Sequence, residues 1–353
     1  MKRMQWQRAV YDERYLGTGY DDRSAVRVLT AESSALHQAV RRASEMLPPG
    51  APLTLFDFGS GTGRVTNEFV ARFAVDCADM RRDLHVVAYD VAANGLRKAA
   101  RNLIHDEGFT VVDKLSWDND APGGYRVGTV ARPAVGEGPA AGVAGGPARG
   151  GGPAVGGPAV SVTFVHGAEG DAAPDVGLLV RAANEGRPFG VTTSWYSAVS
   201  HIPTAARRAE FLRMLCDVTD PRGEVLVAPS VSGDLVELQA EWAGRLAAGT
   251  VGAHPIEQPG DVIYETELGQ QNFYHVFGSD LADLLEECRR PGQRAWLEAV
   301  RMPDEEFTCV AEEQDNYRRA REFNARIGRR RWRPEDFRQV HTALAVLSGH
   351  PGE

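Results

Sequence analysis

Lysine, cysteine and long apolar runs are all scarce in this 353-residue chain. Arginine supplies nearly all of the positive charge, because only three lysines occur: Lys2, Lys98 and Lys114. No C-x-x-C pair is found among the four cysteines, Cys77, Cys216, Cys288 and Cys309. This spacing argues against a zinc ribbon and against a disulfide framework, so we expect reduced thiols and no metal site.

The sequence also lacks the pattern of a membrane-spanning segment and the pattern of a secretory signal. No stretch approaches the roughly 18 to 20 apolar residues that cross a bilayer, and the opening MKRMQWQRAVYDERY lacks the apolar core of a signal peptide. We therefore expect a cytoplasmic protein. The formal net charge of −9 argues against general binding of polyanions, but it leaves room for a local basic patch.

The clearest change of composition lies at residues 131–160, where Gly, Ala, Pro and Val fill almost every position. Because this segment has no aromatic residue and no periodicity, we expect a flexible surface insertion. Its two flanks, 124–132 and 159–167, both have the pattern of strands. The insertion is therefore expected to join the two arms of a hairpin.

The rest of the chain alternates between strand and helix patterns. A helix is predicted over 25–46, followed by strands at 53–58, 84–90, 162–167, 189–195 and 223–230 with helical segments between them. A strand pair at 262–268 and 272–278, a helix at 280–290 and a last strand at 295–300 follow. This order predicts an α/β fold, a doubly wound, seven-stranded and mostly parallel sheet.

We divide the chain into three parts on this basis. Residues 1–48 are expected to form an N-terminal helical lid, residues 49–310 the main domain, and residues 311–353 an arginine-rich helical extension. The 131–160 insertion then interrupts the domain without ending it.

The most informative motif is DFGSGTG, from Asp57 to Gly63, which directly follows a buried strand. Its glycines allow a tight turn and a close approach of a ligand to the backbone, and the next helix begins there with its free N–H groups. A dinucleotide fingerprint needs G-x-G-x-x-G, but Arg64 and Thr66 occupy the third glycine position in the two registers. A phosphate-binding P-loop is excluded as well, because no G-K-[ST] follows.

DFGSGTG resembles the first motif of the class I, Rossmann-like S-adenosylmethionine-dependent methyltransferases, in which an acid precedes x-G-x-G-x-G. Asp90 in VVAYDVA is similar to the acid with which that family accepts both ribose hydroxyls, a task that suits the two oxygens of a carboxylate. Capping of the next helix is the alternative role for Asp90. The resemblance covers roughly residues 50–310 and implies that S-adenosyl-L-methionine is the cofactor. It implies cofactor contacts at Asp57, Gly59, Ser60, Gly61, Gly63, Asp90 and Val91.

Three further segments extend the resemblance. In VHGAEGDA, Asp171, with Glu169 as the alternative, stands where the family often places an acid facing the adenine amine. In TTSWYSAVSHIP, Trp195 and Tyr196 are expected to flank the cofactor, although both can equally be core aromatics. NFYHVFGSDLADLL looks like the family's late hairpin strand entering its last helix.

The chain also departs from the family pattern. The N-P-P-Y and D-P-P-Y signatures of many enzymes that methylate exocyclic amines of bases are absent, and no cysteine follows a proline. Both absences argue against methylation of nucleobases. Gly190 stands where the fourth strand of the family often begins with an acid, so we assign no role to that position.

A general base is the least defined element of the predicted site. His201, His166 and His275 lie at or near the carboxyl ends of predicted strands, where open α/β sheets bind their ligands. His201 is the first candidate, because it stands in the loop after the fourth strand. For each of the three, a hydrogen-bonded structural histidine is the alternative.

The two terminal segments supply the remaining candidates. Tyr15, Tyr20 and Arg23 precede the first helix and are expected to contact substrate or cofactor as a lid, unless that arm is merely solvated. Residues 317–338 hold nine arginines against three acids, and Trp332 lies among them. This segment either contacts RNA phosphates, with Trp332 stacking on a base, or pairs with the acidic body.

Taken together, the residues predict a methyltransferase that acts by in-line displacement on an O or N nucleophile of a small metabolite, in a specialised biosynthetic pathway. The first alternative is an RNA methyltransferase, specifically one acting on transfer RNA, that uses the arginine-rich tail. The second is a cofactor-binding protein of the same fold without catalytic activity.

Overall fold

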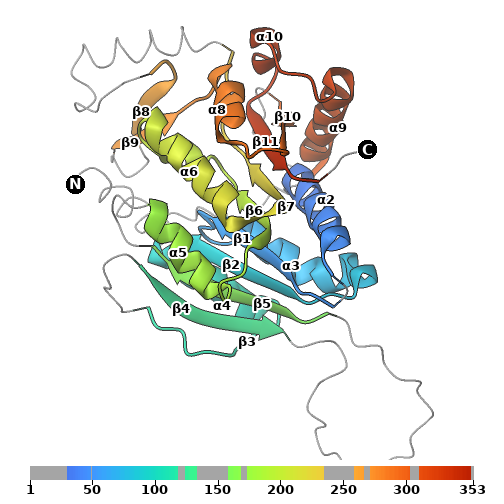
Figure 1. The fold of residues 1–353 in the computed structure, drawn as a ribbon, viewed down its shortest axis with the longest axis vertical. Coiled ribbons are helices and arrows are strands. Elements are labelled where there is room, and N and C mark those ends of the chain that lie inside the picture. Colours follow the sequence, from blue (N-terminus) through green and yellow to red (C-terminus); the bar gives the residue numbers. More distant parts are fainter. Residues whose placement is uncertain are drawn as a thin grey trace, which may run out of the picture.

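The computed structural model describes residues 30–48, 50–117, 124–132, 158–167, 173–233, 258–265, 271–302 and 310–350. Within these ranges nine strands form one sheet in the order β10-β11-β7-β6-β1-β2-β5-β4-β3 (Figure 1). Their bounds are β1 Leu53–Phe58, β2 Leu84–Asp90, β3 Thr110–Val111, β4 Tyr125–Arg132, β5 Val160–His166, β6 Phe189–Ser194, β7 Thr219–Val227, β10 Arg294–Arg301 and β11 Thr342–Ser348.

The pairings of this sheet confirm the doubly wound α/β prediction. β1 pairs in parallel with β2 on one side and with β6 on the other, and β5 and β7 continue the parallel sheet outward. Of the described strands, only β4 and β11 run against this direction. Strand order reverses at β1, so the carboxyl ends of β1, β2 and β6 frame the crevice where such folds bind ligands.

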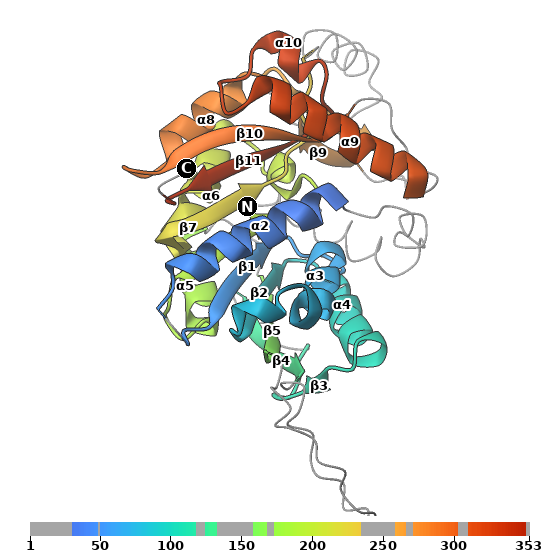
Figure 2. The same ribbon diagram turned by 90° about the vertical axis from the view of Figure 1, so that its right-hand side faces the viewer.

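Helices cover both faces of the sheet. In Figure 2, α2 (Thr30–Met46), α3 (Arg64–Asp76) and α4 (Ala93–Asp106) lie on the near face, and α5 (Ala173–Ala183), α6 (Ala205–Val218) and α8 (Asp280–Cys288) lie behind it. Each face has its own core of buried apolar side chains. On α3, for example, Val65, Phe69 and Phe73 recur every four residues and are buried, which is the spacing of one helix face. Full burial of such a side chain stabilises the fold by about 1.5–3 kcal/mol.

The arginine-rich tail is helical only in part. α9 (Val310–Ile327) packs along the edge strand β10, and the single turn α10 (Pro334–Phe337) follows it. Residues Thr342–Ser348 then form β11, which is inserted between β10 and β7 and buried along its whole length. The prediction of a helical extension to residue 353 is therefore wrong for this stretch. TALAVLS is an apolar run of strand length, and burial on both faces favours such a run in a sheet.

Two other sequence predictions have a clear outcome. β4 and β5 pair antiparallel, so the two flanks of the insertion do form a hairpin, whereas residues 133–157 lie outside the described part. The late strand pair also exists, as β8 (Asp261–Glu265) and β9 (Gln271–His275). It forms a two-stranded sheet of its own and is not part of the main sheet, whose late antiparallel pair is β10 and β11, with α9 and α10 between them in the chain.

The count of seven strands was therefore too low for the main sheet. β3 and β4 extend it beyond β5, and β11 adds a strand from the tail. At the N-terminal side, α2 begins at Thr30, and residues 1–29 lie outside the described ranges. None of the helices in the described ranges is long and apolar enough to cross a bilayer.

Candidate functional site

The glycine motif forms a tight loop between the carboxyl end of β1 and the start of α3. Gly59, Gly61 and Gly63 all have left-handed backbone angles, with φ of 70°, 52° and 76°, which other residues adopt only at a cost. The main-chain nitrogens of Gly59 and Ser60 both donate to the carbonyl of Tyr89 on β2, at 2.9 and 3.0 Å. These bonds hold the loop against the neighbouring strand.

Asp90 closes this loop from the end of β2. Its Oδ2 accepts from the main-chain nitrogen of Gly61 at 2.7 Å, and its Oδ1 accepts from the nitrogen of Ala92, at the N-terminus of α4, at 2.7 Å. Only 7% of Asp90 is exposed. Ala92 is the residue before the first helical residue of α4, so this bond fixes the entry into the helix, and the contact of Asp90 with a cofactor stays a prediction. Because a carboxylate offers about four acceptor positions, holding the loop and binding a diol are compatible.

Asp57 lies beneath the loop and supports it. Its Oδ1 accepts from the hydroxyl of Thr193 on β6 at 2.8 Å, and its Oδ2 accepts from the hydroxyl of Thr66 on α3. Burial raises the pKa of Asp57 to about 7, against the opposing effect of the two hydroxyl donors, and the nearby Asp90 adds to the rise. Asp57 thus joins β1, α3 and β6, and its contact with a ligand stays a prediction.

Several buried polar atoms of the loop and of the carboxyl end of β6 have no hydrogen-bond partner. Among them are Oγ of Ser60, in the loop itself, Oγ of Ser194, the last residue of β6, and Nε1 of Trp195, which follows it. Trp195 is 2% exposed, and a buried indole N–H normally has an acceptor. These atoms fit a site that is completed by a polar ligand.

The segment after β6 adopts a strained turn next to the glycine loop. Tyr196 and Ser197 have consecutive left-handed φ values of 50° and 58°. A Cβ built on Gly59 would lie 2.8 Å from Cβ of Ala198, so the turn packs directly on the loop. Strain of this kind is concentrated at functional sites, and each such residue costs of the order of 1–3 kcal/mol.

Two arginines lie over the ring of Tyr196. The guanidinium carbon of Arg64, the first residue of α3, is 4.8 Å from the ring centroid, and that of Arg301, at the end of β10, is 5.7 Å away. Arg301 also pairs with the buried Glu32 of α2 at 3.4 Å. The Tyr196 ring is thus fixed by cations from two elements, which agrees with a defined position beside the loop.

His201 is the candidate base that the structure orients best. It ends the 3₁₀ turn η2 (Ala198–His201), and its Nδ1 lies 3.0 Å from the carbonyl oxygen of Phe273 on β9. A carbonyl can only accept, so Nδ1 carries the proton and Nε2 is the basic nitrogen of the neutral ring. The same turn begins with Ala198, which packs on the glycine loop.

The two other histidines have structural partners. His166 pairs with Asp90 in the sheet register and donates from Nε2 to the carbonyl of Val91 at 3.1 Å. His275 is fully buried, with Nδ1 2.7 Å from Asp261 and Nε2 3.4 Å from Asp280. His275 is therefore a poor base, because carboxylates engage both of its ring nitrogens.

His275 belongs to a buried ionic cluster that anchors the β8–β9 hairpin. Arg208 of α6 and Asp261 of β8 are each 1% exposed and lie 3.7 Å apart. Arg208 also donates to the carbonyl of Ile202 at 3.0 Å. The hydrogen bond from His275 helps to keep the pKa of Asp280 below its usual value against the effect of burial. The cluster fixes the hairpin that supplies the Phe273 carbonyl.

Several predicted site residues lie outside the described ranges. These are the adenine-facing candidates Asp171 and Glu169 and the lid candidates Tyr15, Tyr20 and Arg23. Their roles stay predictions. Groups of three or more metal-ligating side chains are absent from the described ranges.

The arginine-rich tail pairs in part with acids of the protein itself. Arg330 forms a two-bond ion pair with Asp336 at 2.8 and 3.0 Å, and Arg331 pairs with Asp283 of α8 at 2.5 Å. Trp332 is 3% exposed and packs edge-on between Phe323 and Phe337, with ring centroids 5.3 Å away on each side. Stacking of Trp332 on a base, as the RNA alternative requires, is incompatible with this burial.

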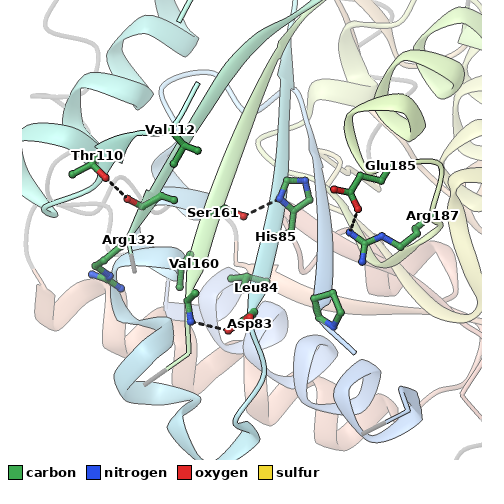
Figure 3. A pocket seen from close by; sticks show the side chains of 13 residues that line it. Asp83, Leu84, His85, Thr110, Val112, Arg132, Val160, Ser161, Glu185 and Arg187 are labelled. Atoms are coloured by element: carbon green, nitrogen blue, oxygen red, sulfur yellow. Dashed lines mark hydrogen bonds and ion pairs between the residues drawn. The ribbon is translucent and has the colours of Figure 1, made fainter. Parts of the chain in front are cut away.

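A pocket of about 430 Å³ lies at the amino ends of β2 and β5, away from the glycine loop (Figure 3). His85 lines it with both ring nitrogens engaged, by Ser161 at 2.9 Å and by the carbonyl of Ala183 at 3.3 Å. Arg187 pairs with Glu185 at 3.0 Å. Burial lowers the pKa of His85. Thr110 and Arg132 bond main-chain carbonyls.

Sequence reasoning missed several residues that build the site. Thr66 and Thr193 bind the Asp57 carboxylate, and Ser230 and Tyr274 bind the turn after β6. Thr193 had a local signal, a hydroxyl near the carboxyl end of a predicted strand, whereas Tyr274 is the third residue of the predicted strand 272–278 and had none. Their partners come from segments far away in sequence, so pattern reading alone could not pair them.

No protein-family model matches this chain, and no curated protein matches it either. Solved structures with a similar fold include a SAM-dependent methyltransferase from Methanosarcina mazei, with 10% identity, coverage of 90% of this chain and 97% of that chain, and a TM-score of 0.43. DesVI of Streptomyces venezuelae shares 11% identity over 93% of this chain and 96% of its own, with a TM-score of 0.40.

The plantazolicin methyltransferase BamL, solved with a desmethyl plantazolicin analogue and SAH, shares 9% identity over 97% of this chain and 90% of its own, with a TM-score of 0.43. At these identities and TM-scores, similarity assigns neither an activity nor a substrate to this chain.

Proposed function

We propose that this chain is an S-adenosylmethionine-dependent methyltransferase that acts on an O or N nucleophile of a small metabolite. One observation carries the proposal: the glycine loop after β1 is closed by the bond from Gly61 to Asp90 at the carboxyl end of β2. This junction lies where the strand order reverses, the place where doubly wound sheets bind their ligands.

The donors and acceptors at this junction suit the cofactor. Asp90 brings a carboxylate for a pair of adjacent hydroxyls, and the loop brings main-chain N–H groups at the start of α3. The unpartnered Oγ of Ser60 and Nε1 of Trp195 add two hydrogen-bonding atoms. When bound, the sulfonium group of the cofactor supplies an activated methyl group.

The protein's own residues then have two tasks: they hold the reactants in place, and they accept one proton. The fixed loop and the turn at Tyr196 and Ser197 hold the nucleophile in line. If the nucleophile carries a proton, Nε2 of His201 accepts it, because Nδ1 is committed to the Phe273 carbonyl. His201 is the proposed base, with His166 retained as a weaker candidate.

A small metabolite is favoured over RNA by the state of the basic tail. At least four of its nine arginines pair with Asp283, Asp336 and other acids, and its tryptophan is buried. RNA binding requires basic and aromatic groups that can reach phosphates and bases. A substrate from specialised biosynthesis agrees with the absence of nucleobase-methylation signatures in the sequence.

The test has a binding step and a transfer step. Calorimetric titration should show binding of S-adenosylmethionine and S-adenosylhomocysteine and no binding of NAD. The enzyme is then incubated with methyl-labelled cofactor and separated RNA, protein and small-molecule fractions of a cell extract. We expect the label in the small-molecule fraction.

The other outcomes are equally informative. Absence of cofactor binding would refute the proposal as a whole, and label in the RNA fraction would support the RNA alternative. Cofactor binding without transfer to any fraction would favour a non-catalytic protein of the same fold.

A further inference from the structure

Three hydroxyl groups from distant parts of the chain meet behind the turn that follows β6. Oγ of Ser197 lies 2.9 Å from Oγ of Ser230, just beyond β7, and Ser230 in turn hydrogen-bonds the hydroxyl of Tyr274 on β9. Ser197 and Ser230 are 7% and 8% exposed. Buried chains of this kind fix the groups that they join.

The turn needs such support because its backbone is strained. Ser197 and the preceding Tyr196 are left-handed although neither is glycine, and a main-chain bond from the Ser197 nitrogen to the carbonyl of Ala228, at 2.9 Å, is its other anchor. Without these bonds, the turn would relax toward ordinary backbone angles.

Relaxation of the turn would be transmitted to the glycine loop. Ala198 follows the strained pair directly, and its Cβ occupies the space next to Gly59, only 2.8 Å from the position of a Cβ there. A shift of Ala198 therefore opens or closes the space beside the loop. The hydroxyl of Tyr274 reaches this turn through Ser230, and Ser197 is also its direct side-chain hydrogen-bond partner.

Tyr274 also lies beside the candidate base. Its ring meets the ring of His201 edge-on, with centroids 4.9 Å apart, and the carbonyl that orients His201 belongs to the adjacent residue, Phe273. Burial raises the pKa of Tyr274, so its hydroxyl keeps its proton in the neutral range. One strand of the β8–β9 hairpin thus contacts both the turn and the base.

We propose that Tyr274 is a positioning residue of the cofactor site, which acts on Ser197, both directly and through Ser230, to hold the turn after β6 against the glycine loop. This assignment rests on the function proposed above. The hairpin that carries Tyr274 is fixed in turn by the cluster of His275, Asp261 and Arg208.

The probe is S-adenosylhomocysteine, titrated calorimetrically into the full-length protein. Tyr274→Phe keeps the ring and removes the hydroxyl, and it should weaken binding about three- to tenfold, as expected for loss of one neutral hydrogen bond. Ser230→Ala removes one of the two routes from Tyr274 to Ser197, so it should weaken binding by no more than Tyr274→Phe does. The double variant Tyr274→Phe/Ser230→Ala should bind no more weakly than Tyr274→Phe alone, because the bond from Ser230 to Ser197 has already lost its anchor.

Tyr317→Phe is the matched control. Its hydroxyl also donates to a serine, Ser34 at 3.2 Å, but joins α9 to α2. We expect Tyr317→Phe to leave the affinity for S-adenosylhomocysteine unchanged even where it lowers the melting temperature. An equal loss of affinity in Tyr317→Phe and Tyr274→Phe would indicate general destabilisation and overturn the assignment.

A rescue variant separates positioning from mere stability. Glycine adopts the left-handed angle of residue 197 without strain, so Ser197→Gly makes the turn independent of the hydroxyl chain. In the Ser197→Gly background, Tyr274→Phe should no longer weaken binding.

The results that contradict the proposal are distinct. If the wild-type protein binds S-adenosylhomocysteine and Tyr274→Phe and Ser230→Ala bind it equally well, Tyr274 does not position the site. If the wild-type protein does not bind it, the proposed function is wrong, and this assignment is wrong with it. Should Tyr274→Phe fail to fold, Ser230→Ala carries the test.

Discussion

The main-chain nitrogen of Gly61 donates to Oδ2 of Asp90 across a distance of 2.7 Å. The two residues end neighbouring parallel strands, β1 through its loop and β2 directly, and they lie at the reversal point of the sheet. Through this bond the acid at the end of β2 shapes the loop, and binding of the cofactor by the same carboxylate stays a prediction.

Removal of this carboxylate should weaken cofactor binding. We expect Asp90→Ala to reduce the affinity for S-adenosylmethionine by about 1.5–3 kcal/mol, which is roughly 10- to 150-fold, because charge-assisted hydrogen bonds are lost. Isothermal titration calorimetry measures the change. Asp79→Ala is the control, since Asp79 is an exposed acid that pairs with Arg41. Equal affinities of wild type and Asp90→Ala would remove Asp90 from the site.

Gly59 allows a test of the loop with a matched partner glycine. Gly59 and Gly186 are both left-handed, with φ of 70° and 76°, but only at Gly59 would a Cβ meet a neighbour, Ala198 at 2.8 Å. Gly186→Ala should cost about 1–2 kcal/mol of unfolding free energy from backbone strain alone and leave cofactor affinity intact. Gly59→Ala should cost more and also weaken binding.

Denaturant unfolding measures the free energy of unfolding of the two variants, and calorimetry measures their affinity for S-adenosylmethionine. If Gly59→Ala binds S-adenosylmethionine as well as Gly186→Ala does, the contact between the loop and the turn has no bearing on the site.

The sequence was sufficient to predict the elements that depend on local pattern. The apolar run LTLFDF followed by GSGTG predicted the β1-loop-α3 unit, and VVAYD predicted β2 with Asp90 at its end. These predictions succeeded because strand burial and glycine turns are encoded within a few residues.

Features that depend on long-range pairing could not be read in this way. The residues of TALAVLS alone do not indicate that this segment enters the sheet between β10 and β7. NFYHVF has the pattern of a sheet strand, yet β9 pairs with β8 outside the main sheet, and Phe277 adds only a single parallel bridge to Val231. Arg208 of α6 and Asp280 of α8 hold the segment through Asp261 and His275. Likewise, Trp332 lies in an arginine-rich segment, and only its tertiary contacts reveal its burial.

Trp332 should contribute to stability and not to RNA binding. The side chain is buried between Phe323 and Phe337, so Trp332→Ala should lower the unfolding free energy by about 3–5 kcal/mol through loss of packing. Filter binding of transfer RNA at low and high salt should show no difference between the variant and the wild type. A folded Trp332→Ala variant with specifically reduced RNA affinity would support the RNA alternative instead.

His201 should act in transfer and not in cofactor binding. With the acceptor found by the labelling experiment, His201→Ala should lower the methyl-transfer rate by about 10²- to 10⁴-fold if this residue is the base. The acidic limb of the pH–rate profile, where a protonated imidazole cannot accept a proton, should flatten. His341→Ala changes an exposed histidine and should retain both the methyl-transfer rate and the acidic limb of the pH–rate profile. Near-normal turnover of His201→Ala would assign the proton to another group.

Asp57 should make the stability of the fold depend on pH near neutrality. Burial raises its folded-state pKa to about 7, whereas an unfolded aspartate titrates near 3.9. Between these values the folded state holds a proton that the unfolded state has lost, so the unfolding free energy falls as pH rises, by at most about 1.4 kcal/mol per pH unit. The stabilisation by this group is complete below about pH 4 and is lost as pH rises through about 7.

Asp57→Asn removes the titrating proton while keeping an oxygen and a donor for Thr66 and Thr193. The unfolding free energy of this variant, measured by urea denaturation from pH 4.5 to 8 in steps, should vary less with pH than that of the wild type, and the two curves should diverge steadily up to about pH 7. Thr193→Val is the complementary variant. It removes a hydroxyl that lowers the pKa of Asp57, so it should extend the pH-dependent range upward. Parallel curves for wild type and Asp57→Asn would show that Asp57 is ionised in the folded protein throughout this range.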